Sequence, residues 1–127
     1  MKQSEIVLVS ADARLLHVQF KPGVELGDLA RLFTAVRELA AERRVKSILI
    51  DARGFRQPVT VVQRMAVAQA VVQAFLGCRV AGVVSVETFD PKLLAETMAR
   101  NRGGNVKFTT SLPEALKWLK RPTRLLA

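Results

Sequence analysis

Several residue types that carry chemistry are scarce in this chain of 127 residues. It has no tyrosine, and only one tryptophan, one histidine and one cysteine. The single cysteine, Cys78, cannot form an internal disulfide, and its place between apolar segments predicts a buried thiol. His17 has no second histidine near it, so we expect a lone surface histidine and neither a zinc site nor a catalytic triad.

Long apolar runs and phosphate-binding loops are also missing. No apolar stretch is long enough to cross a bilayer, and the N-terminal residues lack the apolar core of a signal peptide. The chain contains neither G-x-G-x-x-G nor a glycine-rich loop that ends in Gly-Lys-Ser/Thr. We therefore expect a cytoplasmic protein with no membrane span and no cofactor.

Acidic residues are few, 11 against 20 Lys and Arg, which gives a net charge of +9. This balance permits binding to nucleic acid, acidic protein or anionic lipid. The basic residues are scattered, however, and aromatic residues do not alternate with them as in a single-strand binder. We expect a generally basic surface, and a charge-driven nucleic-acid or anionic-surface binder remains an alternative.

Hydrophobic residues make up 50% of the chain, enough for a core, and the length favours one domain over residues 1–127. Alternation of apolar and polar residues over 14–20 predicts a half-exposed strand, and periodicity predicts the other elements. The expected strands are 5–10, 14–20, 47–50, 80–86 and 106–109, and the expected helices are 26–42, 61–76, 90–102 and one that begins after Ser111. The order ββαβαβαβα predicts an α/β fold with a mostly parallel sheet, one antiparallel edge strand from the N-terminal hairpin, and helices packed on the sheet.

Three carboxylates follow the central strands of the predicted sheet. Asp51, Glu87 and Asp90 could meet at the carboxyl ends of parallel strands, where α/β proteins place their sites. Together they could hold Mg²⁺, and a metal-dependent enzyme is therefore a further alternative. The favoured interpretation is structural: Asp51 ends a buried strand and hydrogen-bonds the basic loop of Arg53 and Arg56, and Asp90 caps the next helix.

Thr60 stands at the predicted start of a helix. With Gln63 it forms the T-x-x-Q pattern of a capping box. A regulatory hydroxyl or an anion site is the alternative, because a helix start carries partial positive charge and Arg53 and Arg56 are close in sequence.

The helix that follows Thr60 has two expected faces. We expect the wide apolar one to pack on the sheet, with Val61, Met65, Ala68, Val72, Phe75 and Leu76. The narrow, uncharged face predicts a homodimer contact, with Gln63, Ala66, Gln69, Ala70 and Gln73.

Three stretches carry a resemblance to a known family. They are ILIDARGF at 48–55, RVAGVV at 79–84, and Phe108 followed by Glu114-Ala115-Leu116 and Trp118-Leu119. The element order and these stretches resemble the STAS domains of anti-sigma-factor antagonists and sulfate-transporter tails. They resemble more closely the small bacterial SpoIIAA-like (STAS/SEC14-like) proteins of unknown role. The resemblance implies a SpoIIAA/STAS-like fold and a non-enzymatic regulatory module that binds another protein or a small anionic ligand.

The same resemblance indicates which residues bind. In the anti-sigma-factor antagonists a serine at the helix start is phosphorylated, and Thr60 falls at that position as a possible phosphoacceptor. Val59 stands where that motif has aspartate, and Val61-Val62 where it has Ser/Thr-Gly. The binding residues implied lie in the loop and helix start formed by residues 51–62: Asp51, Arg53, Gly54, Phe55, Arg56 and Thr60.

Overall fold

The computed structural model describes residues 5–120, so residues 1–4 and 121–127 of the predicted domain lie outside the described part. Its five-stranded sheet has the order β1-β2-β3-β4-β5, with β1 antiparallel to β2 and every other pair parallel. The strands are β1 (Ile6–Ala11), β2 (Leu15–Phe20), β3 (Ser47–Ala52), β4 (Arg79–Val84) and β5 (Asn105–Thr109). The predicted α/β class, element order and antiparallel edge strand are confirmed.

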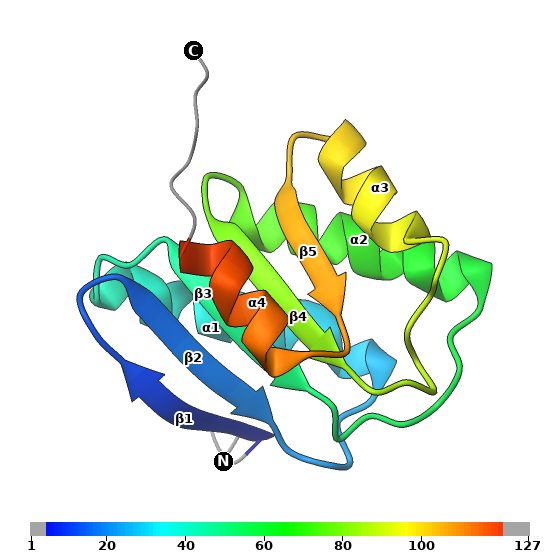
Figure 1. Cartoon of the computed structure of the whole chain (residues 1–127), viewed down its shortest axis with the longest axis horizontal. Helices are drawn as coiled ribbons and strands as arrows, with labels where there is room; N and C mark the ends of the chain where they lie inside the picture. Colours follow the sequence, from blue (N-terminus) through cyan, green and yellow to red (C-terminus); the bar gives the residue numbers. More distant parts are fainter. Residues whose placement is uncertain (1–4, 121–127) are drawn as a thin grey trace.

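The helices cover the two faces of the sheet unequally. A short 3-10 turn, η2 (Leu26–Asp28), leads into α1, and the α-helices are α1 (Leu29–Glu42), α2 (Val61–Phe75), α3 (Leu94–Asn101) and α4 (Leu112–Lys120). The first three α-helices lie side by side behind the sheet in Figure 1, and α4 lies in front of β3, β4 and β5. Crossovers between parallel strands are almost always right-handed, so a strand order that follows the chain sends each crossover helix to the same face.

Two apolar cores result from this arrangement. Alternate residues of β2, Leu16, Val18 and Phe20, are buried beneath the three-helix layer, whereas Gln19 is exposed, as the alternation predicts. The smaller core lies between the other face of the sheet and α4: Leu49, Ala81, Val83, Ala115 and Leu119. No helix within residues 5–120 combines the length and the apolar character needed to cross a membrane.

The start of α3 differs from the prediction. Asp90 does not cap a helix that begins at Pro91; it accepts hydrogen bonds from the backbone N–H groups of Lys92 (2.9 Å) and Leu94 (3.0 Å). This closes a turn, and Leu93 then takes the left-handed conformation (φ 54°) before α3 begins at Leu94. The Asp-Pro pair therefore begins a turn that leads into the helix.

The predicted apolar face of α2 is partly wrong. Val61, Met65 and Leu76 are exposed by 60%, 44% and 62%, and Val71 is buried instead. The stripe that faces the core is Val67, Ala68, Val71 and Phe75, and Arg64 next to it reaches the loop 85–93. Because apolar residues occur all around this helix, its periodicity did not define which of them face the sheet.

Candidate functional site

Two loops meet at the carboxyl edge of the parallel strands. The loop 53–60 joins β3 to α2, and the loop 85–93 joins β4 to α3. Side-chain hydrogen bonds connect them: Ser85 Oγ to the Phe55 carbonyl (2.8 Å), Thr88 Oγ1 to the Gln57 carbonyl (2.7 Å), and Arg64 NH1 on α2 to the Thr88 carbonyl (3.1 Å). These bonds make one continuous surface of both loops and the start of α2, here called the rim.

Asp51 does not point into the rim. It pairs in register with Val83 of the next strand, so its side chain lies on the face of the sheet that α4 covers. Its exposure is 5%, and Arg53 donates to it from the backbone N–H (3.1 Å), from Nε (2.9 Å) and from NH2 (2.7 Å). Burial raises the pKa of Asp51, but these hydrogen bonds and the Arg53 charge outweigh burial and hold the pKa below its usual value. Asp51 therefore orients the start of the loop, as the structural interpretation predicts.

The three carboxylates considered as a metal site are not brought together. Each has its own arginine: Asp51 with Arg53 (2.7 Å), Glu87 with Arg56 (3.1 Å), and Asp90 with Arg64 (3.9 Å). Across residues 5–120, no group of three or more His, Cys, Asp or Glu side chains is arranged to hold a metal ion. The acidic residues at this edge serve as partners for arginine and for backbone N–H groups.

Thr60 forms the predicted capping box. Its Oγ1 accepts from the backbone N–H of Gln63 (3.2 Å), and Gln63 Oε1 accepts from the Thr60 N–H (2.9 Å). Thr60 is exposed, so its hydroxyl is open to solvent while it caps the helix. Arg53 and Arg56 are paired with Asp51 and Glu87, so neither is aligned in advance for an anion at Thr60.

The rim exposes large apolar side chains that sequence reasoning assigned elsewhere. Val62 and Val86 are exposed by 74% and 75%, and Val61 and Met65 lie beside Val62 on α2. We expected Val61 and Met65 in the core and Val86 in a strand. The first turn of α2 lies away from the sheet, so its side chains stay exposed. The position of Val61 and Val62 directly after the helix cap is the sequence signal that could have shown this.

Beneath the rim lies an apolar cavity of about 120 Å³, between the sheet and the layer of α1, α2 and α3. Five of the six phenylalanines of the chain line it: Phe20, Phe33, Phe55, Phe89 and Phe108.

The floor of the cavity depends on a glycine within a central strand. Gly82 of β4 is buried, and a Cβ atom there would lie 3.0 and 3.1 Å from two ring carbons of Phe108. The absent side chain lets the Phe108 ring lie across β4. Ala52 and Ala95 are further small residues in the lining, and larger side chains at these positions would occupy the space.

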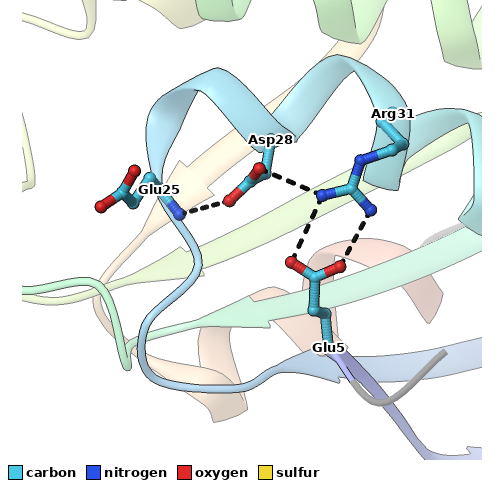
Figure 2. A network of polar contacts seen from close by, with 4 residues as sticks. All are labelled: Glu5, Glu25, Asp28 and Arg31. Carbon is cyan, nitrogen blue, oxygen red and sulfur yellow. Dashed lines mark hydrogen bonds and ion pairs between the residues drawn. The ribbon is translucent and has the colours of Figure 1, made fainter. Parts of the chain in front are cut away.

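A network of polar contacts holds the opposite wall of the cavity, which includes Glu25 and Leu26 (Figure 2). Arg31 donates NH1 to Glu5 (2.9 Å) and NH2 to both Glu5 (3.3 Å) and Asp28 (3.0 Å). Asp28 in turn accepts from the backbone N–H of Glu25 (3.0 Å). The network ties the residue before β1 to the 3-10 turn, so this wall is anchored to the sheet.

His17 is less exposed than expected for a surface histidine. It is half-buried on the face of the sheet that carries Asp51, and its Nε2 atom is buried without a hydrogen-bond partner among the described residues. Burial lowers the pKa of His17, and the nearby Arg53 charge lowers it further. The Asp51 charge raises it, but the net effect is a pKa below the ordinary value.

Comparison of the chain with protein-family models, with curated proteins and with solved structures finds no match in any of the three.

Asp51→Asn is expected to lower the free energy of unfolding by about 1–2 kcal/mol, because Arg53 loses its charged partner at a buried site. Urea denaturation measures this loss of stability. Glu87→Gln is the matched control: its ion pair with Arg56 is exposed, so the substitution should change stability little. The folded pKa of Asp51 is lowered, so its contribution is present above the unfolded pKa and is lost as the pH falls through the folded pKa. Equal losses in both variants would contradict the role assigned to Asp51.

Stability should fall as the pH drops below about 6.5, the ordinary pKa of histidine. The folded pKa of His17 is lowered, so the unfolded chain binds the proton first and protonation favours unfolding. The lowered pKa values of Asp51 and Asp90 keep these carboxylates ionised in this range. Melting temperatures at pH 7.5 and pH 5.5 should show a smaller loss for His17→Gln than for the wild type. The same loss in both proteins would mean that another group is responsible.

Proposed function

We propose that this chain is a non-enzymatic regulatory module of STAS type that docks a partner protein on the rim. The observation that carries the proposal is the set of exposed apolar side chains at the start of α2, Val61, Val62 and Met65, with Val86 also exposed on the loop 85–93. Single exposed apolar residues are common on protein surfaces, but a cluster of them indicates an interaction site. Fully burying a valine contributes about 1.5–3 kcal/mol, so several such residues together would offset much of the entropy lost on association.

The charges around this surface favour a partner with an acidic border. Of the Arg56 side chain 69% is in solvent, and of the Arg53 side chain 47%. Both arginines are paired with carboxylates, so the net charge of +9 supplies the attraction for an acidic protein and would raise its association rate at low salt. We therefore propose an apolar patch bordered by carboxylates as the surface that the rim binds.

The resemblance to anti-sigma-factor antagonists supports Thr60 as the point of regulation. A phosphate on Thr60 would place negative charge directly before Val61 and Val62, which belong to the proposed surface. It would also change the charge that an acidic partner meets there. On this proposal the unmodified protein binds an acidic partner more tightly than the phosphorylated one.

Val62→Glu is the most direct test of the docking surface, because it adds a charge without touching the core. Val9→Glu, on the exposed edge strand β1, is the matched control. A partner is first captured from the host lysate with nuclease present and at two salt concentrations, and identified by mass spectrometry. Its affinity for each purified variant is then measured by calorimetry. We expect Val62→Glu to weaken binding at least tenfold, about 1.4 kcal/mol, and Val9→Glu to leave it unchanged.

Two results would overturn this function. Equal weakening by both substitutions would place the docking surface elsewhere. Capture of nucleic acid alone, lost at high salt, would favour the charge-driven alternative, since phosphate contacts weaken steeply with salt.

Self-association along α2 is a second candidate. Gln63, Ala66, Gln69 and Gln73 are exposed as predicted, whereas Ala70 is half-buried against the core and cannot serve as a free contact. The outer face of α2 carries no charge, and in a chain of net charge +9 such a face brings two copies together with least repulsion. The small side chain at position 66 would let two helices approach closely.

Ala66→Glu should convert a dimer to a monomer, because it places like charges across a two-fold contact. Sedimentation equilibrium measures the mass, and Ala35→Glu on the exposed side of α1 is the control. A wild-type protein that is already monomeric at high concentration, or a dimer that Ala66→Glu leaves intact, would rule out this contact.

A further inference from the structure

We infer that the apolar cavity beneath the rim is a binding site for a small apolar ligand group of about the size of one aromatic ring. Its volume is about 120 Å³. An apolar cavity of ~150 Å³ in another protein binds benzene, so the space suits one ring or a short branched alkyl group. It is too small for a long acyl chain.

The lining sets the chemistry of the ligand. The walls are almost wholly carbon, from phenylalanine rings and from aliphatic residues such as Ile50, Val67 and Val71. A ligand group with its own hydrogen-bond donors or acceptors would lose its water there and find no partner. The part of the ligand that enters must therefore be apolar and uncharged.

The phenylalanines favour a ring over an alkyl group. Phe20 and Phe33 both line the cavity and form a tilted pair with ring centroids 6.2 Å apart. Phe33 also packs against Phe75, with ring centroids 5.5 Å apart and an interplanar angle of 60°. Tilted and edge-to-face contacts are the arrangement that aromatic rings prefer, and one more ring extends the cluster with the same geometry.

The cavity is kept open by residues too small to fill it. Ala52 and Ala95 contribute almost no volume to its lining. Protein interiors normally pack without such spaces, so side chains of ordinary size at these positions would close it.

A path from solvent exists at the rim. Phe55, Val59 and Phe89 line the cavity and are only half-buried, and they belong to the two rim loops. A polar substituent on the ligand can remain in water there while the ring is buried. Although the ligand site and the docking surface share these loops, the ligand test needs only the isolated protein, so the two proposals fail separately.

The experiment is a titration of the isolated protein with toluene, followed by the amide signals in two-dimensional NMR spectra. Phenylacetate, cyclohexane and dodecanoate are the comparison probes. We expect saturable shifts for residues around Ala52, Gly82 and Ala95, and a rise in melting temperature with ligand. Phenylacetate should bind at the same residues, because its carboxylate reaches water at the rim. Cyclohexane should bind more weakly than toluene.

Two variants fill the cavity, and one control leaves it open. Ala52→Leu and Val67→Phe should each abolish the saturable shifts while the protein remains folded, with a melting temperature at or above that of the wild type. Ala35→Leu, which adds the same atoms on the exposed side of α1, should bind toluene as the wild type does. If one filling variant does not fold, the other still decides the result.

Absence of saturable shifts in the wild type would overturn the inference. So would binding that persists in both filling variants, since the probe would then lie elsewhere. Tighter binding of dodecanoate than of toluene, at the same residues, would overturn the assigned ligand size.

Discussion

The direction of the crossovers between parallel strands is the constraint on which the rest of this structure depends. From β2 to β5 the strands follow one another in chain order, and right-handed crossovers then place α1, α2 and α3 together on one face. The loops that leave β3 and β4 are thereby brought together at the carboxyl edge. The same layer of helices encloses the cavity, so the rim and the space beneath it have one origin.

Ion pairs between carboxylates and arginines set the local charge at the carboxyl edge of the sheet. Acidic residues there are neutralised by neighbouring arginines, Asp51 by Arg53 and Glu87 by Arg56. Such pairs orient the loops in which they lie. The other side chains that a ligand or partner can contact here are apolar. They are exposed valines on the surface and phenylalanine rings in the cavity below it. The proposed docking depends on these apolar side chains.

Local patterns in the sequence predicted local structure well. The capping box of Thr60 and Gln63, the alternation in β2 and the role of Asp51 each depend on residues within a few positions of one another. The orientation of α2 could not be predicted, because Val61, Met65 and Val71 are equally apolar and only the packed sheet selects among them. The cavity was also beyond prediction, since its phenylalanines are spread from residue 20 to residue 108 and meet only in the folded chain.

Docking on the rim and attraction over the whole basic surface differ in the part of the chain that a partner covers. Hydrogen–deuterium exchange of the protein, alone and in complex with its captured partner, distinguishes the two. Docking on the rim should confine protection on binding to the loops 53–60 and 85–93 and the first turns of α2. Protection along β1 or spread over exposed arginines and lysines, with these segments unchanged, would contradict it.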